Sequence, residues 1–174
     1  MFYIESERLR LIPLTRELLL LSTTDRPAME RAMGLNVSSM VIDELYIKEF
    51  ADGIASFCLP KLLEFPDRYQ WYSPWEIIRK DTSTAIGCIG FAGYPNESGE
   101  AEMGYLLDKQ EQGKGYASEA FQTAIKWAFT NPEVKDIIVH TFEDNLPSRK
   151  LLTRCGFTEI EKNEENLLTY KLLK

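Results

Sequence analysis

The chain has 174 residues, of which 44% are hydrophobic and 27% are charged, and its formal net charge is −7. This length is typical of one folded domain, and the apolar fraction is enough for a core. The acidic balance disfavours nucleic acid as a partner, because a phosphate backbone requires a basic surface. No apolar run approaches the roughly 20 residues that span a membrane, and the start, MFYIESERLRL, does not resemble a secretory signal. We therefore expect a cytoplasmic protein that binds neither nucleic acid nor membrane.

The first part of the chain is expected to form a strand followed by helices. Residues 7–12 alternate polar and apolar side chains, as a half-buried strand does, and Thr15 can cap the helix that follows. Helical spacing continues over residues 26–65. Within this range the dipeptide Asp52-Gly53 and Pro60 predict a division into two or three helices.

The rest of the chain alternates strands and helices. Strands are expected at residues 69–79, 85–94, 100–107, 136–141, 157–160 and 167–172. The first of these contains Pro74, which requires an edge or bulge position. Small apolar residues recur at three- and four-residue steps over residues 117–128 and predict a helix. A shorter helix is expected at residues 146–155, with Asn145 as its N-cap and Gly156 as its C-terminal stop. This order predicts a single α/β domain with a mixed sheet.

Cysteine and histidine are too sparse for a disulfide framework or a His-rich metal site. The three cysteines, Cys58, Cys88 and Cys155, are odd in number and far apart, and His140 is the single histidine. We expect the cysteines to be small buried hydrophobic residues and no metal to be bound.

The stretch QGKGYA, from Gln112 to Ala117, places two glycines and a lysine directly before the longer helix. Glycines allow positive φ values and a close approach to a ligand, and the first N–H groups of a helix lack partners. These donors favour an anion such as phosphate, and Lys114 adds positive charge. The P-loop pattern fails because Gly115 follows Lys114, and the dinucleotide fingerprint fails because Ser118 replaces its third glycine. On these residues alone, an anion site and a plain turn both remain open.

The same loop resembles a motif of a known family. Gln112-x-x-Gly115-x-Ala117 is similar to the Q/R-x-x-G-x-G/A motif of the GNAT superfamily of acyl-CoA-dependent N-acetyltransferases. The preceding EMGY resembles the family's fourth strand, and ERLRLIPL near the start resembles the first strand of its ribosomal-protein N-terminal acetyltransferase branch. The segment from Asn145 through Ser148 to Phe157 resembles the N-x-x-S…G-F segment of that branch. The resemblance implies a single α/β domain over residues 1–174, whose mixed, mostly antiparallel sheet splays between its fourth and fifth strands and is flanked by helices.

The resemblance also implies where coenzyme A binds. The loop residues expected to hold its pyrophosphate are Gln112, Gly113, Lys114, Gly115, Tyr116 and Ala117. Backbone groups of Leu106 and Leu107 would pair with the pantetheine arm at the splay, and a strand N–H there would face the thioester oxygen. Asn145 would be a further pantetheine contact, although its role as an N-cap is a sufficient structural reason for it.

Acetyl transfer to an amine requires a base, an oxyanion donor and a proton for the departing thiolate. Glu102 is the first candidate for the base, because a carboxylate in a partly dry cleft would have a raised pKa. A solvent-facing Glu102 is the alternative, and His140 is a second candidate. Many family members have a tyrosine four residues before the Gly-Phe pair, but this position is Leu152 here. The resemblance implies that Ser148 serves the thiolate instead, although serine also suits a first helical turn for structural reasons.

Two functions of different classes fit these features. The first is transfer of an acetyl group from acetyl-CoA to a primary amine, either a protein N-terminus or a small molecule, by direct attack in a ternary complex. The second is a non-catalytic acyl-CoA sensor or interaction module, which the missing tyrosine favours. Binding of a nucleotide phosphate is a third possibility. We expect acetyl-CoA and an amine as partners of a monomer or homodimer. The aromatic residues Trp71, Trp75, Phe91 and Tyr105 are expected in the core or in a pocket wall and are assigned no role.

Overall fold

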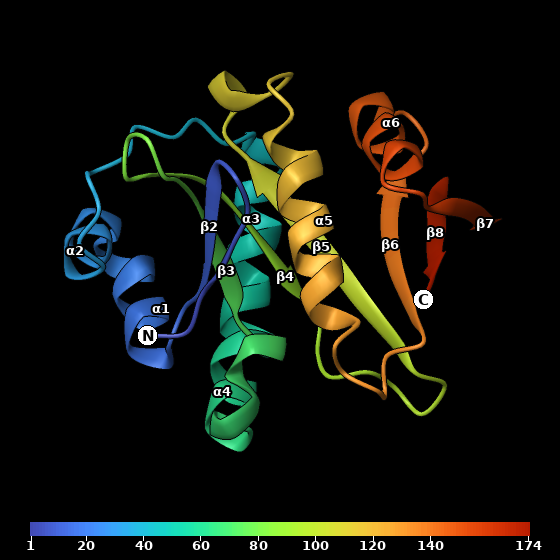
Figure 1. The fold of residues 1–174 in the computed structure, drawn as a ribbon, viewed down its shortest axis with the longest axis horizontal. Coiled ribbons are helices and arrows are strands. Elements are labelled where there is room, and N and C mark those ends of the chain that lie inside the picture. Colours follow the sequence, from blue (N-terminus) through green and yellow to red (C-terminus); the bar gives the residue numbers. More distant parts are fainter.

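A computed structural model describes the backbone of residues 1–174 and every side chain except that of Leu45. The chain forms one eight-stranded sheet in the order β1-β2-β3-β4-β5-β6-β8-β7 (Figure 1). The strands are β1 (Ile4–Glu5), β2 (Leu9–Pro13), β3 (Pro74–Arg79), β4 (Thr84–Phe91), β5 (Glu100–Leu107), β6 (Asp136–Phe142), β7 (Thr158–Lys162) and β8 (Leu167–Leu173). The α-helices are α1 (Arg16–Thr24), α2 (Arg26–Ala32), α3 (Glu44–Gly53), α4 (Leu59–Glu64), α5 (Tyr116–Ala128) and α6 (Leu146–Arg154). The predicted mixed α/β fold is confirmed.

The sheet opens between β5 and β6, its one parallel pair. These strands pair only from Glu100 to Glu102, opposite residues 136–138. On its other edge β5 pairs with β4 from Met103 to Leu107. The second half of β5 is therefore bound on one edge only, and its edge toward β6 is free. This is the predicted splay between the family's fourth and fifth strands.

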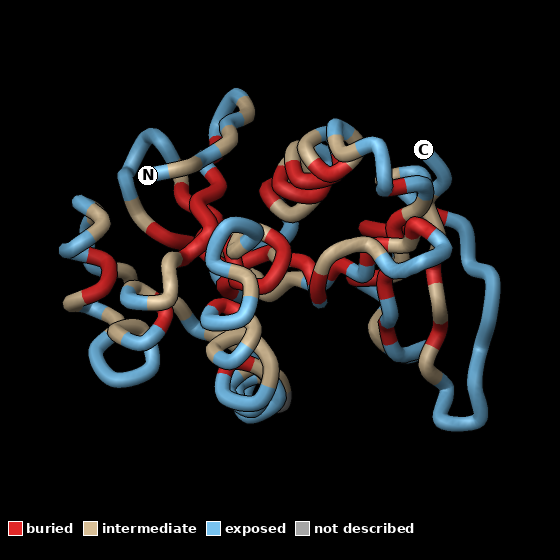
Figure 2. The backbone as a smooth tube through the Cα atoms, turned by 90° about the horizontal axis from the view of Figure 1, so that it is seen from below, coloured by how far each residue is buried: buried red, intermediate tan, exposed pale blue. Residues whose placement is uncertain are grey.

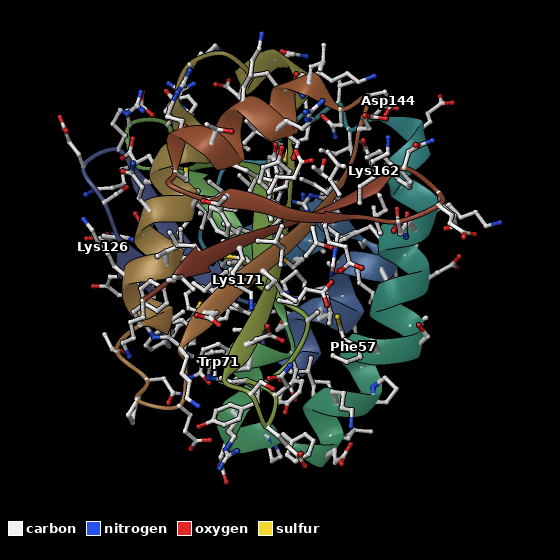
Figure 3. All side chains as sticks on the ribbon, turned by 90° about the vertical axis from the view of Figure 1, so that its right-hand side faces the viewer. Phe57, Trp71, Lys126, Asp144, Lys162 and Lys171 are labelled. Carbon is white, nitrogen blue, oxygen red and sulfur yellow. The ribbon has the colours of Figure 1, made fainter. Side chains whose placement is uncertain are left out.

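An ion-pair group holds the closed end of this splay together. Lys171 of β8, labelled in Figure 3, places its Nζ atom 2.6 Å from a carboxylate oxygen of Glu100 and 3.4 Å from one of Asp136. Glu100 begins β5 and Asp136 begins β6. One ammonium group on β8 thus bridges the two strands where they meet, and they diverge from that point.

Helices cover both faces of the first half of the sheet. On one face Trp127 of α5 packs against Trp75 of β3, with ring centroids 4.7 Å apart. On the other face Arg26 of α2 forms a 2.6 Å ion pair with Glu76, the next residue of β3. Neighbouring strand residues face opposite sides, so α5 and α2 lie in different layers. In Figure 1, α5 crosses in front of the sheet and α3 lies behind it. Burial is concentrated in the central strands and on the inner side of α5 (Figure 2).

The helical region before β3 differs in detail from the prediction. Instead of ending at Gly53, the chain continues through a π-helical stretch, η1 (Ile54–Cys58), directly into α4. Pro60 occupies an early position of α4, where its missing N–H leaves no intrahelical bond unmade. The predicted breaks at Gly53 and Pro60 thus change the helical geometry without separating α3 from α4. Among the described residues, no helix combines the length and the apolar character needed to cross a bilayer.

The strand predicted at residues 69–79 begins only at Pro74. Residues Pro66–Trp71 form a 3₁₀ helix, η2, with a proline in its first turn. Trp71 is buried against Phe91 of β4, so its apolar character serves the core without a strand. Pro74 is the first residue of its strand, a position where a missing N–H is tolerated. The prediction was wrong here because aromatic residues favour burial as much as they favour strands.

The predicted helix ends are confirmed. The Thr15 hydroxyl accepts a hydrogen bond from the N–H of Leu18. The Asn145 side-chain oxygen accepts one of 3.1 Å from the N–H of Ser148. Gly156 follows α6 with φ of +90°, the left-handed conformation in which glycine commonly ends a helix. These local signals are short-range, which is why they can be read from the sequence.

Candidate active site

The loop after β5 delivers the start of α5 beside the splay. Gly113 and Gly115 adopt φ values of +76° and +84°, so both use a conformation that other residues adopt only with strain. Gly115 is the N-cap of α5, and no described side chain caps this helix. The first N–H groups of α5 are thus available to an external acceptor. Nothing lies within 4 Å of a Cβ built on Gly113, which leaves space on the outer side of the loop.

The charges around this loop are arranged differently from the expectation. Lys114 is exposed, and its ammonium group lies 3.0 Å from Glu111. Arg8, which precedes β2, donates a 3.1 Å hydrogen bond to the carbonyl of Lys114 and lies over the ring of Tyr116, 4.5 Å from its centroid. Sequence reasoning missed Arg8, because a separation of 106 residues leaves no local signal. Arg8 ties the N-terminal segment to the predicted pyrophosphate loop.

Glu119 lies in the first turn of α5, where a bare carboxylate would repel a bound phosphate. It accepts hydrogen bonds from the Ser6 hydroxyl at 2.7 Å, the Arg8 N–H at 2.8 Å and the Arg8 Nε at 2.6 Å. Burial opposes ionisation of Glu119, but these hydrogen bonds outweigh it, so its pKa is lowered. The Glu119 carboxylate is therefore ionised, and the positive charge of Arg8 compensates its negative charge.

The ladder between β4 and β5 decides which backbone groups face the splay. The Glu102 carbonyl accepts from Ala92 and the Asp108 N–H donates to Ile86, so both residues bond toward β4. In an antiparallel ladder this pattern repeats every second residue. Leu106 therefore points its backbone groups toward β4, whereas Tyr105 and Leu107 point theirs toward the open edge. The register favours Tyr105 and Leu107 over Leu106 as backbone partners for a molecule in the splay.

Ser148 is placed at the splay by the start of α6, and it is only 4% exposed. Burial raises the pKa of Tyr105 on β5, and Ser148 partly offsets this increase. Leu152 lies one turn further along α6 and is fully buried, so the position where the family tyrosine is absent belongs to the core. The first turn of α6 thus contains one buried hydroxyl, that of Ser148, and its role toward the thiolate stays a prediction.

Asn145 connects two elements, α6 and α3. Its side-chain oxygen caps α6, and its side-chain nitrogen donates a 3.1 Å hydrogen bond to the Tyr46 hydroxyl of α3. An amide nitrogen has two hydrogens and an amide oxygen has two lone pairs, so Asn145 keeps capacity for a further ligand. Tyr46 is a second residue that the sequence did not single out, because no motif covers the region of α3.

Glu102 and His140 lie on the face of the sheet opposite α5. Ala101 and Met103 are buried on the α5 side, and Glu102 between them is exposed. Glu102 pairs in register with Ile138, so His140, two residues further along β6, lies on the same face. The His140 Nδ1 atom lies 3.1 Å from the Thr169 hydroxyl. The partly dry cleft expected around Glu102 is not present in this structure, where its side chain meets solvent.

The expectation that the cysteines are buried holds for Cys88, whereas Cys58 and Cys155 are only half-buried. All three are free thiols. Burial raises the pKa of Cys58 to about 11 and that of Cys88 to about 12, so neither is a thiolate at neutral pH. No group of three or more His, Cys, Asp or Glu residues suited to a metal ion occurs among the described residues.

Comparison with known proteins identifies the family. The acetyltransferase (GNAT) domain matches residues 8–158, which is most of the chain. The protein therefore belongs to the GNAT acetyltransferase family, as the loop and strand motifs predict.

Sequence relatives match about half of the chain. An uncharacterised N-acetyltransferase of Bacillus subtilis, YjdG, is 37% identical over 94 residues, which are 54% of this chain and 56% of that protein. The ribosomal-protein-serine acetyltransferase of Escherichia coli is 33% identical over 72 residues, or 41% of this chain and 40% of that protein. The chain thus spans about half the length of the curated relatives it matches.

Solved structures match over the whole chain at low identity. A putative ribosomal-protein-serine acetyltransferase from Vibrio cholerae superposes with a TM-score of 0.66 at 17% identity, over 99% of this chain and 98% of that one. A structure of RimL, a ribosomal L7/L12 α-N-protein acetyltransferase, in complex with coenzyme A gives a TM-score of 0.64 at 15% identity, over 99% of this chain and 98% of that one. These similarities confirm the fold.

Proposed function

We propose that the protein transfers the acetyl group of acetyl-CoA to a primary amine. The observation that carries this proposal is the uncapped N-terminus of α5, which follows the open edge of β5 after the short 3₁₀ helix Lys109–Glu111 and the glycine loop. An uncapped helix start suits the pyrophosphate of coenzyme A, and a strand with a free edge suits the amide groups of the pantetheine arm. Membership in the GNAT family supports the same cofactor.

In this proposal each end of the cofactor has its own set of residues. Loop residues Gln112 to Ala117 hold the pyrophosphate through backbone N–H groups, with Lys114 contributing charge. The backbone of Leu107 and the side chain of Asn145 contact the pantetheine arm, with Tyr105 in place of Leu106 as the second backbone partner, because the Leu106 backbone bonds toward β4. An N–H on the open edge of β5 faces the thioester oxygen, where it stabilises the negative charge of the tetrahedral intermediate.

The acceptor amine approaches from the face that carries Glu102. There Glu102 takes a proton from the amine through a water molecule, which its exposed carboxylate can contact. His140 lies on the same face and is the alternative base. The amine attacks the thioester carbonyl directly, and Ser148 serves the thiolate as the carbon–sulfur bond breaks. Because Glu102 and Ser148 lie on different faces of the sheet, the proton taken from the amine and the proton given to the thiolate follow separate routes.

Two classes of acceptor deserve priority in testing. The name of the Escherichia coli relative favours peptides with an N-terminal serine. The net charge of −7 favours cationic small amines such as polyamines. The test is a panel of both classes, in which release of the free coenzyme A thiol is followed with a thiol reagent.

The absence of a tyrosine at Leu152 favours a second candidate, a non-catalytic acyl-CoA sensor. Calorimetry of acetyl-CoA binding, combined with the thiol-release assay, separates the two functions. A sensor binds acetyl-CoA and releases no thiol with any amine of the panel, whereas an enzyme releases thiol in proportion to acetylated amine. Binding of ATP or NAD with no affinity for coenzyme A would contradict both.

A further inference from the structure

Two buried carboxylates hold the connector between α2 and α3, residues 37–43. Near its start, Glu30 of α2 accepts a 2.8 Å hydrogen bond from the N–H of Ser38. Near its end, Asp108 accepts one of 3.1 Å from the N–H of Val41. Glu30 is 1% exposed and Asp108 is 7% exposed, so water competes little for either bond. These bonds fix both ends of a segment that has no regular secondary structure.

Asp108 also begins the chain segment that leads to the predicted pyrophosphate loop. It follows β5 directly and is the N-cap of the 3₁₀ helix Lys109–Glu111. Its Oδ1 atom accepts a 3.0 Å hydrogen bond from the N–H of Gln110 as well as the bond from Val41. Its own N–H donates a 2.8 Å bond to the carbonyl of Ile86 on β4. One buried residue thus holds the loop and the connector in a fixed relation to the sheet.

Lys109 adds two contacts to the same attachment. Its N–H donates a 2.9 Å hydrogen bond to the carbonyl of Val41, and its ammonium group lies 3.1 Å from the carboxylate of Asp43. Val41 is therefore bound through both its N–H and its carbonyl. The ion pair is half-exposed, so it contributes less than the backbone bonds. In Figure 1, α3 accordingly begins beside the C-terminal end of β5.

The chain crosses the open end of the splay directly after these contacts. Tyr46, in the first turn of α3, accepts a 3.1 Å hydrogen bond from Asn145 at the start of α6. β5 and β6 are parallel and pair only near their N-terminal ends, so Asp108 and Asn145 lie on opposite sides of the opening. Residues 41–46, which we call the strap, are thus fastened on both sides of the place proposed for the pantetheine arm.

We propose that Asp108 is a positioning residue that couples the strap to cofactor binding. This inference rests on the proposed coenzyme A site at residues 112–117. Coenzyme A bound there restrains the loop that Asp108 caps, and this restraint keeps Oδ1 directed at the N–H of Val41. The strap is then held across the splay. By linkage, a strap that is held in place favours coenzyme A binding to the same degree.

The coupling reaches the acceptor through α3. In Figure 1, α3 and α5 lie on opposite faces of the sheet, so α3 is on the face from which the amine is proposed to approach. Loss of the Asp108 bond loosens the start of α3 on that face. No group of the strap is assigned to proton transfer, so the coupling acts on the acceptor KM and not on the chemical step.

Hydrogen exchange of the Val41 N–H tests the strap without any acceptor. In the wild type, saturating coenzyme A should slow this exchange about fivefold or more, as is typical of coupled sites. Asp108→Ala should abolish the slowing, because the N–H loses its acceptor. Asp108→Asn should retain it, because both bonds end on Oδ1 and an amide oxygen can take its place. Exchange of the Ser38 N–H, held by Glu30, should be the same in all three proteins.

Steady-state kinetics tests the effect on the acceptor. Asp108→Ala should raise the acceptor KM about fivefold, while kcat changes less than about twofold. Tyr46→Phe releases the other end of the strap, and adding it to Asp108→Ala should change KM little further, because the strap is already loose. The matched control is Asp25→Ala. Asp25 caps α2, away from the splay, by accepting a 2.9 Å bond from the N–H of Ala28, and its loss should change neither constant.

The same measurements distinguish this inference from the proposed function. A wild-type protein that binds no coenzyme A overturns both. Coenzyme A that binds without slowing the exchange of Val41 overturns the strap alone, and so does equal slowing in the wild type and in Asp108→Ala. An Asp108→Asn variant that behaves like Asp108→Ala would show that Oδ1 is not the coupling atom and would also overturn it. Slowed exchange without thiol release from any amine overturns acetyl transfer and leaves the strap in place.

Thermal melting shows which variants are folded. If Asp108→Ala does not fold, the wild-type exchange and Tyr46→Phe decide the question. Tyr46→Phe removes only a hydroxyl, and it should reduce the slowing of Val41 exchange by coenzyme A. Slowing as large as in the wild type would mean that the two ends do not act as one strap.

Discussion

Asn145 donates a 3.1 Å hydrogen bond from its side-chain nitrogen to the Tyr46 hydroxyl, and so connects the start of α6 with α3. The two residues are 99 positions apart in the chain. The bond brings a helix from the motif-free N-terminal region next to a residue of the C-terminal motif. Through it, the helical region before β3 contacts a residue that is expected to hold the cofactor.

Replacing Tyr46 with phenylalanine should measure this connection. The half-buried Asn145 amide would lose its acceptor, and the free energy of unfolding should fall by about 1 kcal/mol. Urea denaturation gives the value. The control is Tyr94→Phe, whose hydroxyl bonds to Glu133 at the surface and should contribute little. Equal effects of the two substitutions would mean that the Tyr46 bond is no stronger than a surface contact.

Substitutions at Gly115 should separate backbone strain from charge at the predicted pyrophosphate site. Gly115→Ala places a side chain at φ of +84° and should cost about 1–2 kcal/mol of stability. Gly115→Asp adds a negative charge beside the phosphates and should weaken coenzyme A binding further, as calorimetry would detect. Gly34→Asp is the control, because Gly34 has φ of +74° and open space around it. Unchanged coenzyme A affinity in Gly115→Asp would remove the loop from the site.

The lowered pKa of Glu119 predicts a pH-dependent contribution to stability. A carboxyl whose pKa is lower in the folded state stabilises the fold above its unfolded value, near 4.5, and this contribution is lost as the pH falls through the folded value. Glu119→Gln should therefore lower the free energy of unfolding at pH 7 by about 1 kcal/mol, a modest value because Arg8 is 44% exposed. The difference from the wild type should shrink as the pH is lowered below 4.5. A difference that is constant with pH would mean that ionisation of Glu119 is not involved.

Glu102→Gln tests the base. Turnover at neutral pH should fall about 10²–10⁴-fold, while coenzyme A affinity stays unchanged, because a base acts on the amine and not on the cofactor. His140→Gln is the companion variant, since His140 lies on the same face of the sheet. A loss of less than about threefold in Glu102→Gln, together with a large loss in His140→Gln, would transfer the role to the histidine.

Much of the fold follows from short-range patterns. The caps at Thr15 and Asn145, the stop at Gly156 and the apolar spacing of α5 involve residues within a few positions of each other, so they can be read directly. Residues 69–73 were wrongly predicted as part of a strand, because a run of aromatic residues is as compatible with a buried turn as with a strand. Pro66 was the available signal, since it suits the first turn of a 3₁₀ helix.

The sequence by itself determined the α/β class, the order of most elements, and the position of the glycine loop at the start of α5. Only the tertiary structure decided which distant groups meet there. Arg8 reaches the loop from before β2, and Tyr46 reaches Asn145 from α3. It also decided that Leu106 bonds toward β4 while its neighbours face the splay. Such contacts depend on strand register and on how layers pack, and these are set by the whole core rather than by neighbouring residues along the chain.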